Sequence, residues 1–449
     1  LEMPFGEVST ITKLVPAELN ITLDRALEES ADFRKRYEED EEAHRVIDLA
    51  RKIEGLPRNT SIHAAGVVIA KSPLTSQVPV WVSDGTLVTE YDKDDVEALG
   101  LLKMDFLGLR NLTFVQKMQE LLAETEGIKI AINEINLEDK ETLALFASGN
   151  TKGIFQFEQP GAIRLLKRVQ PVCFEDVVAT TSLNRPGASD YINNFVARKH
   201  GQEEVTVLDS ALEDILAPTY GIMLYQEQVM QVAQRFAGFS LGKADILRRA
   251  MGKKDASAMH EMRASFIQGA LEAGHTAEKA EQVFDVMEKF AGYGFNRSHA
   301  YAYSALAFQL AYFKTHYPAI FYQIMLNSAN SDYVTDALEA GFEVAPLSIN
   351  TIPYHDKIAN KFIYLGLKSI KGLSKDLALW IIEHRPYSNI EDFLSKLPEN
   401  YLKLPLLEPL VKVGLFDSFE KNRQKVFNNL ANLFEFVKVL GSLFGETIY

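Results

Sequence analysis

The chain has 449 residues, with 47 basic and 61 acidic side chains, a formal net charge of -14, and 47% hydrophobic and 24% charged residues. This composition excludes a disordered chain and, at roughly 100–200 residues per domain, predicts about two to four folded domains. The acidic balance argues against a protein that coats nucleic acid non-specifically, because such binding depends on many Lys and Arg side chains, but it leaves room for a local basic groove.

The one cysteine, Cys173, excludes an internal disulfide and a Cys-rich zinc site, and it fits a reducing compartment. The sequence has no run of about 18 apolar residues and no charged-then-apolar leader. We therefore expect a soluble, cytoplasmic protein without a membrane partner. The first residues, Leu1-Glu2-Met3-Pro4, resemble the interior of a longer protein.

Residues 23–53 have the charged, amphipathic pattern of helices, and the acidic run at residues 38–42 is typical of a solvated helix face. Strand patterns and one hairpin-type turn come next, at residues 66–70, Asp84-Gly85, 86–91 and 101–107. Together these segments predict a small sheet.

After residue 111 the pattern is mainly helical and is broken by clusters of Pro and Gly. Long amphipathic stretches lie at residues 222–236, 277–290 and 300–317, the last ending before Pro318. Residues 331–353 are more irregular, and a second, smaller helical unit covers residues 362–436. No repeat of fixed period is present. The predicted fold class is mainly α with a small β-sheet, in an α+β arrangement.

The strand pattern at residues 101–107 contains two charged side chains. Because side chains alternate across a strand, Lys103 and Asp105 share one face with two leucines. Charges inside an apolar strand are costly to bury unless they pair with each other or meet a metal or an anionic ligand. The residues leave two interpretations open, which are a plain Lys103–Asp105 ion pair and a ligand-binding pair.

Positive charge gathers at residues 243–254, at the end of a short helix that we expect Gly252 to close. Within residues 243–263 basic side chains outnumber acidic ones, against the balance of the whole chain. Adjacent Arg and Lys groups on one helix end suit a triphosphate, which needs several donors at once. Cations that complement the helix dipole are the alternative interpretation.

A Gly-spaced aromatic loop at residues 292–299 leads directly into a helix. Ser298 is a natural N-cap, so the N–H groups after it would face an anion. Tyr293 and Phe295 would stack on a base, and His299 would donate to a phosphate. An ordinary helix cap with a buried aromatic staple also accounts for this loop.

Residues 370–382 have a turn of the Gly–hydrophobic–small type followed by an apolar helix. This is close to the helix-hairpin-helix pattern, in which backbone N–H groups of the hairpin contact a DNA phosphate without reading sequence. Ser374 stands where the pattern prefers a second Gly, and we expect this departure to weaken the tight turn. An ordinary helical hairpin is the alternative.

Taken together and in this order, six segments resemble the alpha subunits of bacterial DNA polymerase III, the C-family replicative polymerases. The segments are residues 61–69, 103–110, 183–187, 220–230, 247–254 and 290–296. The resemblance extends from about residue 4 to residue 449.

The resemblance implies four regions in this chain. They are a thumb remnant at residues 1–60, the C-terminal part of a polymerase-β-like palm at 61–110, fingers at 111–330 and a helix-hairpin-helix DNA-binding region at 331–449. The implied reaction is template-directed addition of dNTPs to a primer 3′-OH during DNA replication, by phosphoryl transfer at a two-metal Mg²⁺ site. The implied partners are primer-template DNA, dNTP and, in the parent protein, a sliding clamp and a clamp loader.

The resemblance also assigns roles to individual side chains. Asp105 matches a metal-binding and catalytic carboxylate of the palm, and Lys103 would approach the nucleotide phosphates. The implied nucleotide-binding residues are Arg185, Arg248, Arg249, Lys253, Lys254, Tyr293, Asn296, Ser298 and His299. The implied DNA-binding residues are Gly372, Leu373, Ser374 and Lys375.

The chain departs from the family pattern in its catalytic carboxylates. The family's first two catalytic aspartates lie in a D-x-D strand, and no residue here matches it. Asp92-Lys93-Asp94-Asp95 has the spacing but lies in a polar turn. We therefore expect the parent protein to be a DNA polymerase and this 449-residue chain to be inactive alone.

Leu443-Phe444 is similar to the end of a sliding-clamp-binding peptide, but the leading Gln is absent and the end of a core helix is the favoured interpretation. The competing function for the whole chain comes from a different class. It is a non-catalytic DNA-binding or assembly module that uses the helix-hairpin-helix unit as a scaffold.

Overall fold

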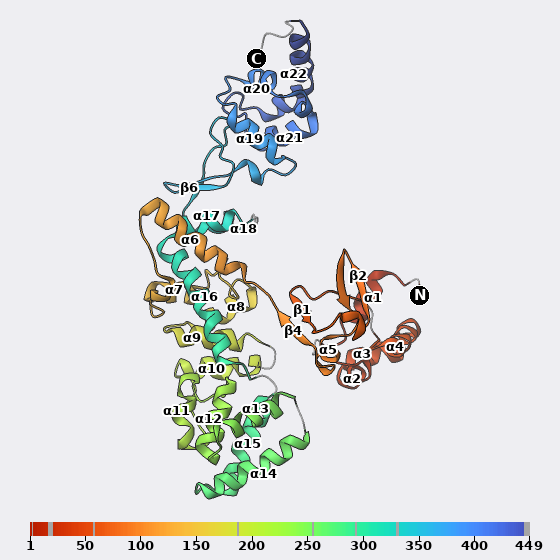
Figure 1. Ribbon diagram of the computed structural model, residues 1–449, viewed down its shortest axis with the longest axis vertical. Helices are drawn as coiled ribbons and strands as arrows, with labels where there is room; N and C mark the ends of the chain where they lie inside the picture. The colour runs from red at the N-terminus through yellow and green to blue at the C-terminus, as the bar shows by residue number, and fades with distance from the viewer. Residues whose placement is uncertain are drawn as a thin grey trace. The chain divides into compact units, whose positions relative to one another are not determined.

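The computed structural model describes residues 1, 3–16, 21–56, 59–185, 188–253, 256–291, 294–328 and 332–443. The chain divides into two compact units, Leu1–Gly108 and Leu109–Tyr449, each with its own contacts (Figure 1). Most of the described residues are helical, and the strands are short. The predicted fold class, mainly α with a small amount of β, is confirmed.

The first unit begins with four helices around a small core. They are α1 (Phe5–Thr12), α2 (Leu23–Glu29), α3 (Ala31–Glu39) and α4 (Glu41–Ile53). The helical pattern at residues 23–53 is thus divided into three helices, because Ser30 and Asp40 act as N-caps. The Ser30 side chain accepts a hydrogen bond from the backbone N–H of Phe33, and Asp40 accepts from those of Glu42 and Ala43.

The strands of the first unit form two separate sheets. The elements are β1 (Gly66–Ile69), β2 (Val80–Ser83), β3 (Thr86–Thr89), α5 (Lys93–Ala98) and β4 (Leu102–Asp105). Strand β1 pairs with β4, and β2 pairs with β3, both antiparallel. The prediction of one small sheet is therefore wrong, because strand pairing depends on tertiary contacts that strand patterns do not report. The predicted hairpin turn is present, with φ of 47° at Asp84 and 78° at Gly85.

The second unit contains a helical bundle in which the long helix α16 packs against α6, α7, α9 and α17 (Figure 1). The helices of this bundle are α6 (Arg110–Glu126), α7 (Lys140–Ser148), α8 (Pro160–Val169), α9 (Phe174–Leu183), α10 (Ile192–Lys199), α16 (Arg297–His316), α17 (Pro318–Leu326) and α18 (Asp332–Glu339). Their shared core includes Phe146, Phe308 and Phe313, which are fully buried. Pro318 ends the helical pattern as predicted but also opens α17, where its fixed φ suits a first helical position.

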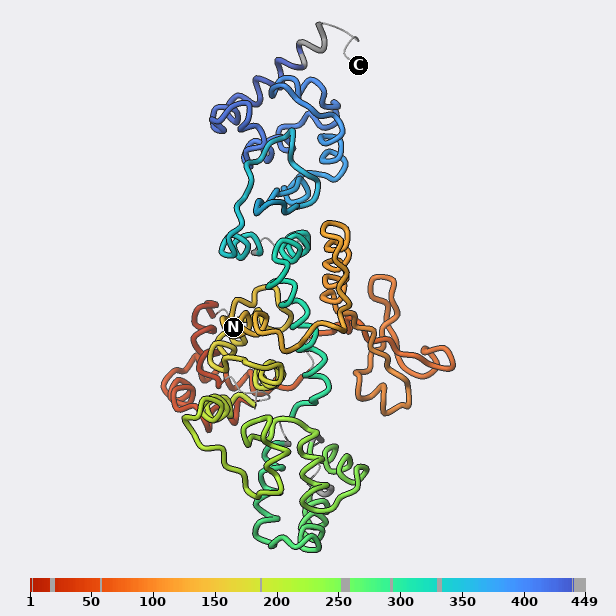
Figure 2. The backbone as a smooth tube through the Cα atoms, turned by 90° about the vertical axis from the view of Figure 1, so that its left-hand side faces the viewer, coloured from red at the N-terminus to blue at the C-terminus, as the bar shows by residue number. Residues whose placement is uncertain are grey.

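A second bundle packs around its own core in this unit, and Figure 2 shows it in green. It contains α11 (Glu213–Leu216), α12 (Gln226–Ala237), α13 (Leu241–Lys253), α14 (Ala256–Glu272) and α15 (Ala277–Ala291). The rings of Phe236 and Phe266 stack at its centre. A Cβ at Gly269 of α14 would collide with the backbone carbonyl of Ala237, so this helix contact requires glycine.

The C-terminal part has a third core and a three-stranded sheet that the sequence patterns did not predict. Its elements are β5 (Glu343–Val344), β6 (Lys357–Ala359), β7 (Phe362–Tyr364), α19 (Lys375–Glu383), α20 (Ile390–Lys396), α21 (Leu404–Lys412) and α22 (Arg423–Leu443). The strand order is β5-β7-β6. Across the part of the chain that is described, no helix has both the length and the apolar character needed to cross a membrane.

Candidate nucleotide and nucleic-acid site

Lys103 and Asp105 lie on one face of the β1–β4 sheet, as their spacing predicts. Val68 pairs with Lys103 and Gly66 with Asp105, so these four residues share that face. Neither charge is buried: Asp105 is exposed and Lys103 is half-buried. Among the described residues no ion pair joins them, and the Asp105 carboxylate accepts a hydrogen bond from the backbone N–H of Leu107 at 3.2 Å.

The two charges are therefore not enclosed in an apolar environment, and the opposite face of the same sheet also reaches solvent. Val67, Ile69, Leu102 and Met104 point there and are 49%, 46%, 56% and 39% exposed. The face of Val67 and Met104 is thus open in the chain, whereas on the other face Val68 packs against the buried Val78, Val96 and Leu101, and Lys103 and Asp105 still reach solvent beside it. The charges need no partner to offset a desolvation cost, which removes the argument for a plain ion pair.

His63 joins Lys103 and Asp105 at the same face, and the sequence patterns did not single out its side chain. Its Nδ1 accepts hydrogen bonds from the backbone N–H of Gly66 at 2.6 Å and of Ala65 at 3.1 Å. A Cβ on Gly66 would lie 2.9 Å from His63 Nδ1 and 3.1 Å from Lys103 Cε. Glycine at this position therefore lets both side chains lie close over β1.

The two adjacent arginines of α13 share one carboxylate. Asp245 Oδ1 bonds Arg248 through Nε at 2.9 Å and Nη2 at 2.7 Å, and Asp245 Oδ2 bonds Arg249 Nη2 at 2.6 Å. The Arg248 side chain is 30% exposed and that of Arg249 is 68% exposed. Both arginines thus reach solvent from one helix face, but neither is unpaired.

Other basic residues of this stretch turn away from the two arginines. Lys243 bonds Ser265 and lies over the ring of Phe239, and Arg263 pairs with Asp285 at 2.6 Å and with Glu288 at 2.7 Å. The sequence expectation that Gly252 closes the helix is also wrong, because α13 extends to Lys253. Beyond its helical backbone nothing is described for Lys253, and Lys254 lies outside the described residues.

Gln226, the first residue of α12, joins the arginine helix to the aromatic loop. Its Oε1 accepts from Arg248 Nη1 at 3.3 Å, and its Nε2 donates to the carbonyl of Gly294 at 3.0 Å. Its backbone N–H donates to Phe295 O at 2.9 Å, and the Phe295 N–H donates to Leu224 O at 3.3 Å. Two segments that are separate in the sequence therefore meet at this one glutamine, which the sequence patterns missed because a lone Gln on a helix carries no signal.

The loop ends at an N-cap that differs from the predicted one. Asn296, not Ser298, caps α16, and its side chain accepts from the backbone N–H of His299 at 2.8 Å. Ser298 already lies inside the helix, whereas Asn296 has the extended backbone that a cap requires. Tyr293 lies outside the described residues.

The N-terminus of α16 is already bonded to a carboxylate of the chain. Glu227 accepts from the Asn296 side-chain amide at 3.0 Å and from the backbone N–H of Arg297 at 2.8 Å. This carboxylate takes the position at which the sequence predicted a bound anion. Glu227 follows Gln226 directly, so the first turn of α12 holds the loop through two side chains.

Arg185 and His299 meet at the ring of Phe295. The Arg185 guanidinium lies 3.9 Å from the centre of that ring, and the His299 ring meets its edge at 5.4 Å. On its other side His299 lies 3.9 Å from the ring of Tyr303. Burial, and then the charge of Arg185, lower the pKa of His299 below its ordinary value, which favours the neutral imidazole.

Ser298 faces a different space from His299. It lines a cavity of about 560 Å³ together with Glu227, Arg297 and Tyr301. Arg297 pairs with Glu175 at 2.6 Å, which fixes its guanidinium at this wall. Around the α16 N-terminus, Arg185 and His299 therefore meet at Phe295, whereas Ser298 lines a separate cavity.

The Gly372 hairpin has the geometry expected for a helix-hairpin-helix turn. Gly372 has φ of 87°, a conformation that favours glycine. Ser374 caps α19 by accepting from the backbone N–H of Leu377 at 3.3 Å, and its φ of -72° requires no glycine. Ser374 therefore fits this position as an N-cap, and the expected weakening of the turn stays a prediction.

The surface of this hairpin is open. Gly372, Ser374 and Lys375 are exposed, and Leu373 is half-buried. Among the described residues, the backbone N–H groups of Gly372 and Ser374 have no acceptor. A second turn at Gly414, also with φ of 87°, lies near Arg423, and a Cβ there would collide with that guanidinium.

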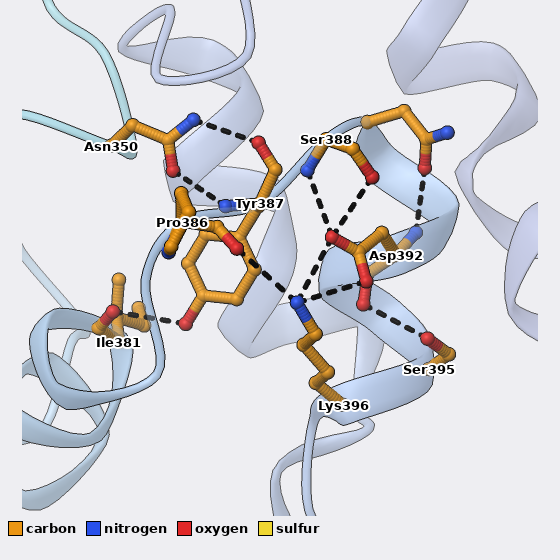
Figure 3. A network of polar contacts seen from close by, with 9 residues as sticks. Asn350, Ile381, Pro386, Tyr387, Ser388, Asp392, Ser395 and Lys396 are labelled. Carbon is orange, nitrogen blue, oxygen red and sulfur yellow. Dashed lines mark hydrogen bonds and ion pairs between the residues drawn. The ribbon is translucent and has the colours of Figure 1, made fainter. Parts of the chain in front are cut away.

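A polar network fixes the segment that follows α19 (Figure 3). The Asn350 side chain exchanges two hydrogen bonds with the backbone of Tyr387, both at 2.8 Å. Asp392 accepts from the backbone N–H of Ser388 at 2.8 Å and pairs with Lys396 at 3.0 Å. These bonds connect the segment between α19 and α20 to the segment before β6, and the Tyr387 hydroxyl donates to the Ile381 carbonyl of α19 at 2.9 Å.

Three family models match the chain in sequence order. Residues 1–108 match the bacterial DNA polymerase III alpha NTPase domain, residues 111–274 match the bacterial DNA polymerase III alpha subunit finger domain, and residues 341–426 match a helix-hairpin-helix motif.

Curated relatives match along nearly the whole chain. The DNA polymerase III subunit alpha of Streptococcus pyogenes is 57% identical over 447 residues, which are 100% of this chain and 43% of the relative. The Thermus aquaticus subunit is 41% identical over 435 residues, covering 93% of this chain and 36% of that protein. The Bacillus subtilis (strain 168) subunit is 41% identical over 427 residues, covering 93% and 38%. The chain therefore spans less than half the length of each of these relatives.

Proposed function

The chain belongs to the family of bacterial DNA polymerase III alpha subunits, and from this membership we propose that it takes part in template-directed addition of dNTPs to a primer 3′-OH during DNA replication. The observation that carries the nucleotide part of the proposal is the junction at Gln226. There, the helix assigned to the triphosphate and the loop assigned to the incoming nucleotide are hydrogen-bonded through one side chain. A nucleotide that contacts both segments needs them close together.

In this proposal Arg248 and Arg249 bind the triphosphate, with Lys253 and Lys254 following on the same segment. A pair of guanidiniums offers forked donors that match phosphate oxygens. Arg185, Asn296 and His299, with Ser298 and Tyr293, contribute to the loop beside the nucleotide. A neutral His299 still donates one N–H to an acceptor.

We assign Asp105 as one metal-binding carboxylate and Lys103 as a contact to the phosphates. A two-metal centre lowers the pKa of the attacking hydroxyl and neutralises phosphate charge, and it needs several carboxylates. Within the described residues no three His, Cys, Asp or Glu side chains lie close enough together to hold a metal ion. These side chains therefore do not fit a complete Mg²⁺ site, and we propose that the 449-residue chain does not extend a primer by itself.

The DNA contact is assigned to the hairpin formed by Gly372, Leu373, Ser374 and Lys375. Its two unbonded N–H groups and the exposed Lys375 are suited to a phosphate of the DNA backbone. The proposed regions are a thumb remnant at 1–60, part of a palm at 61–110, fingers at 111–330 and a DNA-binding region at 331–449.

A sliding clamp and a clamp loader are proposed partners of the longer alpha subunit. The clamp-binding hypothesis for this chain rests on two C-terminal residues. No side chain is described for Leu443, and Phe444 lies outside the described residues. A pull-down with clamp tests the hypothesis, and equal retention of the chain after Leu443→Ala with Phe444→Ala would remove it.

Calorimetric titration of the 449-residue chain with dATP and Mg²⁺ tests the nucleotide assignment. We expect binding that is weakened at least tenfold by Arg248→Ala and unchanged by Arg263→Ala. Arg263 is the matched control because it has the same 30% side-chain exposure and is also bonded to carboxylates in this bundle. DNA binding without any dATP binding would favour the alternative, a non-catalytic DNA-binding or assembly module.

Primer extension separates the remaining possibilities. With primer-template, dNTPs and Mg²⁺, we expect no incorporation by this chain. Incorporation that disappears on Asp105→Ala would show instead that the chain holds a working catalytic centre.

A further inference from the structure

We propose that Asp245 is an internal competitor of the triphosphate, which holds Arg248 and Arg249 in the nucleotide-free chain and releases them to phosphate oxygens on binding. The inference rests on the proposed function, because it takes these arginines as the triphosphate ligands. It adds a regulating residue that neither the family pattern nor the charge count of this segment indicates.

The first step is the division of the Asp245 carboxylate between two partners. Each of its oxygens bonds a different guanidinium, Oδ1 that of Arg248 and Oδ2 that of Arg249, with bond lengths of 2.6 to 2.9 Å. The spacings along α13 are three and four residues, which place the three side chains on one helix face. The Arg248 and Arg249 bonds lower the pKa of Asp245, so the carboxylate is charged at neutral pH.

The second step is the occupation of one edge of the Arg248 guanidinium by Asp245. Its Nε and Nη2 bond Asp245, and its Nη1 bonds Gln226 Oε1. Every nitrogen of this guanidinium therefore has a partner in the chain. These bonds use three of its five N–H donors, and Asp245 occupies the Nε–Nη2 edge. A phosphate that binds this edge must displace the Asp245 carboxylate, which a polyphosphate also repels.

The third step concerns the direction of the effect. A plain helix ion pair stabilises α13 by a few tenths of a kcal/mol and has no effect on ligand affinity. Removal of a competitor changes two quantities in opposite directions. It lowers the stability of the helix, and it raises the affinity for the ligand because it exposes donors and deletes a negative charge beside the ligand. Affinity and stability measured together therefore distinguish the two roles.

The test measures inorganic tripolyphosphate, and separately dATP with Mg²⁺, binding to the 449-residue chain and to Asp245→Asn. We expect affinity for both ligands to rise about three- to tenfold, which is the order expected for removing one unit charge near a partly screened anion. We expect the melting temperature to fall slightly at the same time. Asp245→Gln, with a better helix former, serves as a second variant and must raise affinity as well.

Asp285→Asn is the matched control. Asp285 bonds Arg263 at 2.6 Å in the same helical bundle, so its loss removes a carboxylate–arginine pair away from α13, while Arg263 keeps Glu288 at 2.7 Å. We expect a change in stability no larger than that of Asp245→Asn and no change in affinity. In Arg248→Ala the gain from Asp245→Asn should shrink, because the benefit acts through that guanidinium.

The outcomes separate this inference from the proposed function. Unchanged or weaker affinity in both Asp245 variants, with intact binding by the unmodified chain, overturns the inference and leaves the triphosphate assignment standing. Binding by the Asp245 variants alone supports the inference strongly. Absence of binding in all three proteins overturns both.

Discussion

The buried ion pair between Lys314 and Asp336 offers the sharpest test of how the helical core around α16 is held together. The two side chains are 4% and 16% exposed, and their charged atoms are 2.7 Å apart. Asp336 also accepts from the hydroxyl of Tyr322 at 2.8 Å, while the Lys314 ammonium has one further bond, to the carbonyl of Lys152 at 3.0 Å. One carboxylate thus connects α16, α17 and α18.

Asp336→Ala leaves the Lys314 ammonium buried, with the Lys152 carbonyl as its remaining hydrogen-bond acceptor among the described residues. We expect this change to lower the free energy of unfolding by about 3–5 kcal/mol, because a buried charge loses its counter-charge. The exposed pair Lys412–Glu408, with side chains 60% and 37% exposed, is the reference. Glu408→Ala should cost less than about 1 kcal/mol, because an exposed pair gains little in water.

The cost of Asp336→Ala should also depend on pH. Burial lowers the pKa of Lys314 even with Asp336 present, and without Asp336 it should fall further. The folded variant then binds fewer protons than the unfolded chain, so its stability rises with pH over the range between the lowered pKa and the ordinary lysine value. The deficit of the variant should therefore shrink from pH 7 to pH 10.

Urea unfolding followed by circular dichroism measures the total cost, and hydrogen exchange of the α16 amides assigns it to this part of the chain. Replacing both partners, with Lys314→Met and Asp336→Leu, should recover most of the lost stability, because no unpaired charge remains. An Asp336→Ala cost no larger than that of Glu408→Ala, or a deficit that grows with pH, would refute this reasoning.

Three further predictions concern other parts of the molecule. Gly269→Ala should destabilise the α12–α14 packing by about 1–3 kcal/mol, because its Cβ meets a backbone carbonyl; a melting curve equal to that of the unmodified chain would contradict this close approach. The backbone N–H of Ala43 holds the pKa of Asp40 below its ordinary value, so the stability from this charged N-cap is present above about pH 4 and lost as the pH falls through the lower folded value. Thermal unfolding at pH 6 and pH 2.5 should therefore show Asp40→Asn losing less stability on acidification than the unmodified chain. Lys371→Gln with Lys375→Gln should weaken duplex DNA binding for all sequences and reduce the salt dependence of that binding. Fluorescence anisotropy between about 50 and 200 mM salt measures both effects, and an unchanged salt slope would show that these lysines do not contact DNA.

Local features of the fold could be predicted from the sequence where neighbouring residues determine them. The Asp84-Gly85 hairpin turn needs two positive φ angles, and these residue types adopt them readily. The amphipathic stretches gave helices at the expected places because the period of apolar residues reflects one buried face. The sequence patterns could not predict that β1 pairs with β4 in a separate sheet, because strand partners are selected by the packing of the whole unit.

Only some features of the candidate site could likewise be predicted from the sequence. The arginine helix and the aromatic loop could be found because several chemically related residues stand together in each. Their junction at Gln226 could not be predicted, because it depends on a single glutamine that contacts residues distant in the sequence. The proposed competition at Asp245 could not be predicted either, because a charge count includes this carboxylate without showing that it bonds both arginines. The N-cap of α16 was misplaced for a related reason, since Asn296 and Ser298 are both good capping residues and only the backbone distinguishes them.

The open apolar face of the β1–β4 sheet has a practical consequence for work with this polypeptide. Val67, Ile69, Leu102 and Met104 form an exposed apolar patch on a sheet of two strands. Among the described residues no further strand pairs with the outer edge of β1 or of β4. Exposed strand edges and apolar patches of this kind promote edge-to-edge strand pairing and aggregation between molecules. Preparations of the chain should therefore become turbid as concentration rises, and a lysine at Leu102, which would charge that patch while leaving the Asp105 face untouched, should keep them clear.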